Sequence, residues 1–203
     1  MDVAEQIRRA VSSYYADFAE TLKPRQGLSR LLKPAADKLR MLVARMRLRS
    51  DMRTAVRQAH VDAARSVVGD ATLTPVDMVA INVRVDREYV YLEGFLSDIP
   101  TMNEAEAQRR AALYLNAAAQ TGSIIAAIEL PTLPVYPGSY QLACNGFCRC
   151  HLRVEALDGE GNWDVWWVVD TEAEHCSDCV ALSAEWSPLR IRNGEILSVI
   201  TGV

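Results

Sequence analysis

The sequence predicts a mainly α-helical protein in which a helical body is followed by a small β-hairpin module, an α+β arrangement. Three observations lead to this prediction. Apolar residues recur at helical intervals through most of the first 130 residues, three prolines interrupt residues 131–140, and apolar residues alternate with polar ones beyond residue 150. We therefore expect a helical body over 1–130, a Pro-rich connector over 131–140 and a Cys-rich β-hairpin module over 141–203.

The composition is that of an ordinary globular protein. Half of the 203 residues are hydrophobic and 24% are charged, which excludes a wholly disordered or fibrous chain. No run of apolar residues approaches the 18 needed to cross a membrane, and the first residues lack the basic and then apolar order of a secretory signal. We expect synthesis and folding in the cytoplasm and no membrane contact.

The first two helices are expected over 2–22 and from about 33 or 34 to 68. Pro24 and Gly27 mark the loop between them. Arg49 and Arg53 interrupt the apolar stripe of the second helix. Either the helix rotates out of the core at these residues, or the two cations face an acidic partner. We favour the first interpretation. The stripe consists of residues at helical spacing: Leu39, Leu42, Met46, Val56, Ala59, Ala63 and Val67.

Two further helices are expected before the connector. Thr74 and Pro75 have the form of an N-cap followed by a first-turn proline. The alternation of residues 81–85 would suit a strand, but a helical template explains more positions: Met78, Ile81, Val85, Tyr89, Leu92, Leu96 and Ile99. Pro100 ends this helix, and residues 101–104 form a capping box for an Ala-rich helix that reaches about Ile128.

Charge is distributed unevenly along the chain. Residues 1–70 carry 14 Lys and Arg against 8 Asp and Glu, whereas the remainder carries 8 against 18. The second helix is therefore basic, and its Arg45, Arg47, Arg49 and Arg53 are candidates for contact with nucleic acid or an acidic protein. Simple solvation of these side chains is the favoured interpretation.

A β-hairpin is expected beyond the connector. Cys150, Leu152, Val154 and Ala156 alternate with polar residues, residues 158–162 supply a turn, and a Trp-rich strand returns over 163–169. Antiparallel pairing brings the cysteines before the first strand close to those after the second.

All five cysteines lie between positions 144 and 179. Clustering of this kind in a chain without a signal peptide favours a metal site over a disulfide framework. Two closely spaced pairs on turns suit tetrahedral zinc, and the favoured ligands are Cys144, Cys148, Cys176 and Cys179. Cys150 and His175 are the alternative ligands. Two disulfides, or free thiols, are the alternative explanations for the cluster. The preferred fold is thus a helical body with a zinc-stapled β-hairpin module.

An enzyme is not expected. The chain contains no nucleophile elbow, phosphate-binding loop, dinucleotide-binding fingerprint or zinc-hydrolase motif. A zinc ion that is saturated by four thiolates has no open position for water or substrate, so the metal is expected to be structural.

Several short elements follow one another over about residues 70–190. They are Leu73-Thr-Pro-x-Asp77, Tyr91-Leu-x-x-Phe95, Leu133-Pro-x-Tyr-Pro-Gly138, Cys144-x-x-x-Cys-Arg-Cys150, Glu174-His-Cys-x-x-Cys179 and Trp186-Ser-Pro188. The Cys-Arg-Cys and His-Cys-x-x-Cys elements are the most distinctive of them. In this order the elements resemble tailed-bacteriophage minor head and head-morphogenesis proteins, in particular the carboxy-terminal part of the Mu-type minor capsid family.

The resemblance implies a structural protein of the virion, assembled in the host cytoplasm and located near the portal, at the neck or with the capsid. It implies contacts with capsid, portal or neck proteins in a symmetric assembly of several copies. The basic helix would then face packaged DNA or an acidic neighbour. The alternative function is a zinc-ribbon regulator that binds nucleic acid through the same helix.

Overall fold

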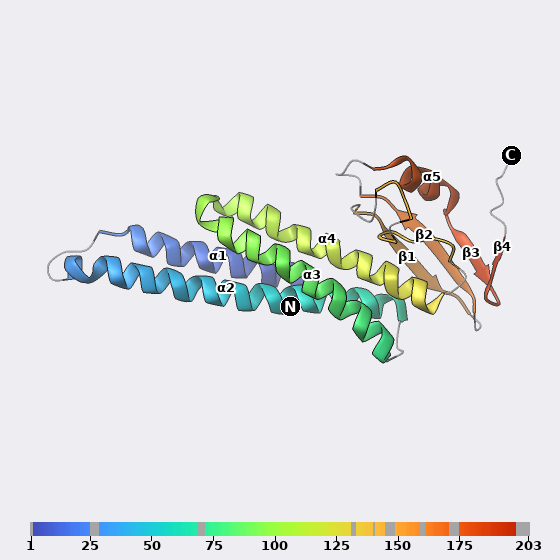
Figure 1. Cartoon of the computed structure of the whole chain (residues 1–203), viewed down its shortest axis with the longest axis horizontal. Helices are drawn as coiled ribbons and strands as arrows, with labels where there is room; N and C mark the ends of the chain where they lie inside the picture. Colours follow the sequence, from blue (N-terminus) through green and yellow to red (C-terminus); the bar gives the residue numbers. More distant parts are fainter. Residues whose placement is uncertain are drawn as a thin grey trace. The chain divides into compact units, whose positions relative to one another are not determined.

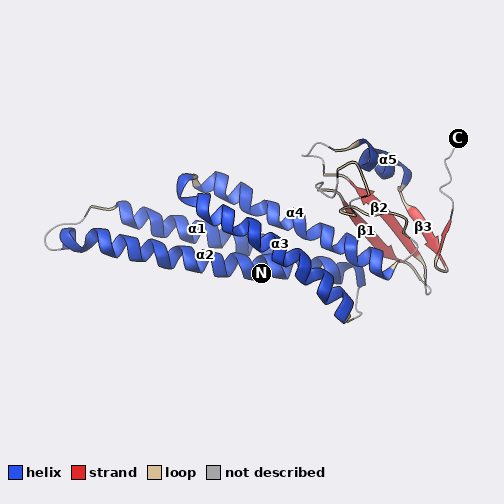
Figure 2. Cartoon of the chain, viewed as in Figure 1, coloured by secondary structure: helices blue, strands red, loops and turns tan. Residues whose placement is uncertain are grey.

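Four long helices precede a small sheet in the computed structural model (Figure 1; Figure 2). The structure describes residues 2–24, 29–68, 72–130, 133–139, 141–144, 149–158, 161–170 and 175–197. The helices are α1 (Val3–Leu22), α2 (Ser29–Val68), α3 (Pro75–Asp98) and α4 (Glu104–Glu129), with the 3-10 turn η1 (Ile99–Thr101) between the last two. This confirms the predicted mainly helical fold class.

The C-terminal strands form one antiparallel sheet in the order β1-β2-β3-β4. The predicted hairpin is present, with Leu152 opposite Trp167. Two further strands extend it to four, and the short helix α5 lies between β2 and β3 in the chain. The elements are β1 (His151–Ala156), β2 (Trp163–Val168), α5 (Ser177–Glu185), β3 (Leu189–Arg192) and β4 (Glu195–Leu197). The last two strands were not predicted.

The chain forms two compact units. The first comprises Met1–Ala59 and Val85–Leu115, and the second comprises His60–Arg84 and Asn116–Val203. The boundary therefore runs through α2, α3 and α4, whereas the sequence predicts one at residues 131–140. The physical reason is contact within the second unit: the Leu152 amide donates a 2.8 Å hydrogen bond to the Ser123 hydroxyl of α4, so the sheet is tied to this helix.

The core of the first unit draws on all four long helices. The helical pattern predicted for α3 is confirmed, because Leu92, Leu96 and Ile99 are completely buried in this core. The Tyr15 hydroxyl donates a 2.9 Å hydrogen bond to the Met102 carbonyl and so joins α1 to the turn between α3 and α4. The other buried members include Ile7, Val11, Tyr14, Ala44, Leu48, Met52, Val56, Phe95, Ala107, Ala111 and Tyr114.

The predicted apolar stripe of α2 is wrong in its first half. Leu39, Leu42 and Met46 are exposed by 62%, 56% and 62%. The core is formed instead by a stripe with four-residue spacing that starts at Ala44 and includes Leu48. At about 100° per residue, the three exposed side chains point to the side of the helix opposite this stripe. An apolar pattern alone does not show which of two faces is buried.

Arg49 and Arg53 do not mark a turn of α2 out of the core, because buried residues continue on either side of them. Both cations face Glu93 of α3: Arg49 forms an ion pair with this carboxylate, and Arg53 lies 3.9 Å from it. The Arg53 guanidinium also lies over the Tyr89 ring, 4.5 Å from its centroid. The acidic group that these arginines meet thus belongs to the same chain.

One of the two predicted helix caps is confirmed. The Thr74 amide donates to the Asp77 carboxylate at 2.7 Å, and the Asp77 amide donates to the Thr74 hydroxyl at 3.2 Å, which is a reciprocal capping box. At α4, however, the capping side chain is Asn103, which accepts a 2.9 Å hydrogen bond from the Glu106 amide. The Thr101 hydroxyl donates instead to the Asp98 carbonyl, so the cap lies two residues later than predicted.

Helix α4 packs closely against α2 within the second unit. A Cβ atom placed on Gly122 would lie 2.9 Å from the Ala63 carbonyl oxygen, so only glycine fits there without a shift. By length and composition alone α4 could cross a membrane, but buried helices of soluble proteins pass the same test. Of its apolar 18-residue window, 53% is buried inside the protein.

His60 of α2 is completely buried in the second unit, and its Nδ1 atom lies 2.6 Å from the Thr121 hydroxyl of α4. Burial, assisted by the nearby Arg84 cation, lowers the pKa of His60 from 6.5 to about 4. Between pH 6.5 and 4, His60 is protonated in the unfolded chain but stays neutral in the folded chain. Stability is therefore expected to fall by about 1.4 kcal/mol per pH unit between pH 6.5 and 4.

This prediction is tested by denaturant unfolding at pH 7 and pH 5, followed by helical circular dichroism. His60→Gln keeps a hydrogen-bonding side chain but does not titrate, so the loss of stability between these pH values should be smaller in the variant by about 2 kcal/mol. An equal loss in the variant and the wild type would contradict the assignment.

Candidate metal centre

Two of the predicted ligands lie at the start of α5. Cys176 is the N-cap residue of this helix, with extended backbone angles, and its Sγ atom accepts a hydrogen bond from the Cys179 amide at 3.5 Å. The Val180 amide donates to the Cys176 carbonyl at 3.2 Å and completes the turn. This tight turn directs both sulfur atoms to the same side, as a Cys-x-x-Cys pair must do to bind one ion.

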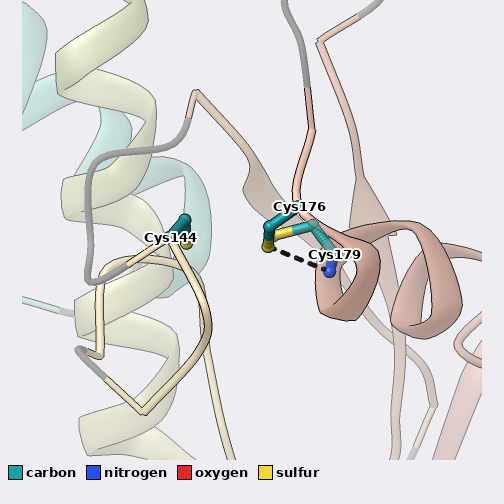
Figure 3. Close-up of side chains that lie close together, drawn as sticks. All are labelled: Cys144, Cys176 and Cys179. Carbon is teal, nitrogen blue, oxygen red and sulfur yellow. Dashed lines mark hydrogen bonds between the residues drawn. The ribbon is translucent and has the colours of Figure 1, made fainter.

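Cys144 approaches this turn from a distant part of the chain (Figure 3). The Ala143 amide donates a 2.8 Å hydrogen bond to the Asp178 carboxylate of α5, which ties the segment carrying Cys144 to the helix. The Sγ atoms of Cys144, Cys176 and Cys179 all lie within 4.8 Å of one another. Zn–S bonds of about 2.3 Å in a tetrahedron require sulfur separations of about 3.8 Å. Three thiolates placed in this way fit one ion.

The surroundings favour the thiolate form of Cys176. Burial alone would raise the pKa of Cys176, but hydrogen bonds from the backbone and side chains of Cys179 and Cys144 outweigh it and lower the pKa. Cys179 is completely buried, whereas Cys144 and Cys176 are half-buried. The thiolate is the form in which a cysteine binds a metal, so the lowered pKa of Cys176 is compatible with a ligand role.

Of the four predicted ligands, the structure brings three together. The fourth, Cys148, lies in residues 145–148, outside the described residues. Among the described residues, the cluster does not include the alternative ligands Cys150 and His175. These two side chains contact each other instead, with Cys150 Sγ 3.6 Å from His175 Nδ1. His175 Nε2 donates to the Asp170 carbonyl, which leaves Nδ1 as the acceptor for the Cys150 thiol when the ring is neutral.

No disulfide joins the four cysteines that the structure describes, namely Cys144, Cys150, Cys176 and Cys179. For these residues the disulfide alternative is not supported. Three sulfur atoms placed in this way could bind one metal ion.

Aromatic side chains around the site serve mainly in packing. Trp167 and Trp186 are 2% exposed and meet edge to face, with their ring centroids 5.5 Å apart. The Trp167 amide also donates to the Trp186 carbonyl, so the segment after α5 is fastened to β2. Trp166 is half-buried, and the Arg153 guanidinium lies 4.0 Å from its ring centroid. This arrangement joins α5, the hairpin and β3 into one small body.

Two acidic residues, one that positions the cluster and one that orients the neighbouring His175, were not predicted from the sequence. Asp178 holds the segment of Cys144, and the backbone carbonyl of Asp170 orients His175. The position of Asp178, inside the Cys-x-x-Cys turn and in the first turn of a helix, was the only signal, because a carboxylate there accepts backbone hydrogen bonds. Nothing in the sequence singles out a backbone carbonyl such as that of Asp170.

Comparisons of the chain with protein-family models, with curated proteins and with solved structures find no significant match. The assignment of the site therefore depends on the geometry of the three cysteines and on the residue pattern.

Proposed function

We propose that this protein is a non-enzymatic structural component of a tailed-phage virion, and that a structural zinc ion stabilises its C-terminal unit. The proposed ligands are Cys144, Cys148, Cys176 and Cys179. The observation that carries the proposal is the meeting of three cysteine sulfurs from two distant segments, all within 4.8 Å of one another.

The donor set supports zinc over harder cations. Magnesium and calcium prefer oxygen ligands, whereas thiolates select zinc and other soft metals. The Cys176–Cys179 turn also provides an amide hydrogen bond to a ligand sulfur, which lowers the cost of placing negative charge there. A four-thiolate zinc has no free coordination position, which supports a structural role and not hydrolysis.

The residue pattern that resembles minor head proteins supports a role in head assembly, close to the portal, neck or capsid. The proposed activity is the formation of protein–protein contacts with other virion subunits. Packaged DNA is a less favoured partner of the basic helix, because two of its four candidate arginines, Arg49 and Arg53, already face Glu93.

The test is the composition of purified phage particles. Particles from the phage that encodes this chain are treated with nuclease, purified by density and analysed by quantitative mass spectrometry. A fixed number of copies per particle is expected, together with arrested head assembly when the gene carries an early stop codon. Absence from particles would contradict the proposal. Salt-sensitive DNA binding by a protein that is absent from particles would support the zinc-ribbon regulator instead.

A further inference from the structure

We propose that an exposed apolar stripe near the start of α2 binds an acidic amphipathic helix of another protein, which lies in line with the end of α3. This inference rests on the proposed role in assembly and adds to it the chemistry of one partner. All the residues that carry it belong to the first compact unit.

Helix α3 covers α2 only in part, because α1 and α2 extend past the end of α3 (Figure 1). Glu93 of α3 forms an ion pair with Arg49 of α2. The Tyr89 hydroxyl donates a 3.0 Å hydrogen bond to the Arg53 carbonyl, so the two helices run antiparallel. Since α3 ends at Asp98, it stops about five residues before Arg49 along α2. The preceding turns of α2 extend beyond it.

These preceding turns expose a continuous apolar stripe. We name it the arm stripe and define it as Leu39, Leu42, Val43 and Met46, which are exposed by 62%, 56%, 37% and 62%. Their spacing of three and four residues places them along one side of the helix, away from the core stripe. A helix with apolar residues on two sides normally has a partner on each of them.

The arm stripe points in nearly the same direction as the residues of α2 that meet α3. At about 100° per residue, Leu42 and Met46 lie within about 60° of Arg49 and Arg53 around the helix axis. A helix that continued the line of α3 would therefore pack on the arm stripe. The position next to α2 that α3 occupies at Arg49 and Arg53 is open at the arm stripe.

Cations border the arm stripe and define the chemistry of its partner. Residues 38–50 contain five Lys and Arg and no Asp or Glu. For Lys38, Arg45 and Arg47 no ion pair is found within the described part of the chain. Lys38 and Arg45 also lie within about 40° of Arg49 around the helix axis. The row of cations that meets α3 thus continues beside the arm stripe.

The contact between α2 and α3 shows what this row of cations binds. Arg49 forms an ion pair with Glu93, and Arg53 lies 3.9 Å from the same carboxylate. The Arg53 guanidinium also lies over the Tyr89 ring. A helix that carries a carboxylate and an aromatic side chain therefore neutralises the row where α3 is present. Lys38 and Arg45, about three turns and one turn earlier, suit the carboxylates of a further helix.

Other occupants suit the arm stripe less well. Two copies packed antiparallel about a two-fold axis near Leu42 would place Lys38 beside Arg45 of the other copy, and like charges oppose this dimer. Nucleic acid suits the cations, but its phosphates do not suit the apolar side chains between them. A bilayer surface suits both, but the stripe has none of the aromatic residues that anchor proteins there.

The experiment measures the binding of a labelled synthetic helix to the purified chain by fluorescence anisotropy. The probe has about 18 residues, or five helical turns, with Leu at helical spacing on one side and Glu on both flanks. Saturable binding is expected, with an affinity that falls about tenfold or more at high salt. Matched peptides with Lys in place of Glu, or with Ser in place of Leu, should not bind.

Charge reversal on the chain tests the same contact from the other side. Lys38→Glu with Arg45→Glu should weaken binding of the Glu peptide about tenfold or more and should allow the Lys peptide to bind. Leu42→Ser, at a side chain that is 56% exposed, should weaken binding without a change in charge. The control is Arg65→Glu, an exposed charge reversal elsewhere on α2, which should bind as the wild type does. Circular dichroism establishes that each variant is folded.

A wild-type chain that does not bind the Glu peptide, or that binds the Lys peptide equally well, would overturn the inference. Tighter binding of phosphatidylglycerol vesicles or duplex DNA through Lys38 and Arg45 would do the same. In particles, a photo-reactive residue in place of Leu42 should crosslink to an acidic helical segment of another virion protein. If the chain is absent from particles, the proposed function is wrong, whereas the peptide result still decides the chemistry of the arm stripe.

Discussion

Replacing Cys179 with serine is expected to abolish stoichiometric zinc binding and to unfold the β-sheet module. Cys179 is completely buried, its sulfur belongs to the three-cysteine cluster, and its amide supports Cys176. A serine hydroxyl is a poor zinc ligand, and the apparent binding energy of structural zinc, about 10–16 kcal/mol in small zinc domains, contributes directly to folding. A small sheet with little apolar area has few other means of compensation.

The readouts separate the module from the long helices. All four tryptophans lie between residues 163 and 186, so Trp fluorescence reports on the module alone. The variant should show fluorescence of exposed tryptophan, should contain no zinc by elemental analysis and should retain most of the helical circular dichroism of α1–α4.

Cys150→Ala is the matched control, since Cys150 is equally buried but contacts His175 and not the cluster. It should retain one zinc per chain and lose only about 1–3 kcal/mol of stability. Loss of zinc from both variants would show that Cys150 is a ligand and that the proposed ligand set is wrong.

Leu48→Ala is expected to destabilise the first unit by about 2–5 kcal/mol, whereas Leu42→Ala should change its stability by no more than about 0.5 kcal/mol. The two leucines lie six residues apart on the same helix, but Leu48 is 1% exposed and Leu42 is 56% exposed. The truncation of Leu48 leaves a cavity, and that of Leu42 removes atoms from solvent. Denaturant unfolding followed by circular dichroism measures both.

The same pair of variants tests which face of α2 is buried. The apolar pattern of the sequence predicts that Leu42 lies in the core. Equal losses of stability in the two variants, or a larger loss for Leu42→Ala, would contradict the packing of α2 through Leu48.

Local signals in the sequence were sufficient to predict much of the fold. The third helix was distinguished from a strand because seven apolar residues follow helical spacing from Met78 to Ile99, and the structure confirms that helix as α3. The Thr74–Pro75 start was predicted from capping chemistry, which depends only on neighbouring residues. The hairpin and the meeting of the cysteines followed from alternation and turn composition in the same way.

The features that could not be predicted depend on contacts between distant residues or on elements too short to form a pattern. Arg49 and Arg53 are balanced by Glu93, some forty residues later, and no local pattern pairs them. Leu39, Leu42 and Met46 have the same spacing as a core stripe, so only the packing of the folded chain shows that they stay exposed. Strands β3 and β4 have four and three residues, too few to produce a clear alternation.

The position of the cysteines was predictable, but the choice among them was not. Spacing alone left Cys150 and His175 as alternatives to the first pair. The structure separates them from the cluster because the hydrogen bond from His175 to the Asp170 carbonyl turns the other ring nitrogen towards Cys150. That orientation depends on the backbone just after β2, which residue spacing does not specify.

The most direct test of the account is the zinc content of the purified wild-type chain before and after chelation, measured together with Trp fluorescence. We predict one zinc per chain and a loss of the folded fluorescence signal when a strong chelator removes the metal, with recovery on return of zinc. Protein that contains no bound zinc, and whose fluorescence and unfolding do not change with chelator, would contradict the central claim.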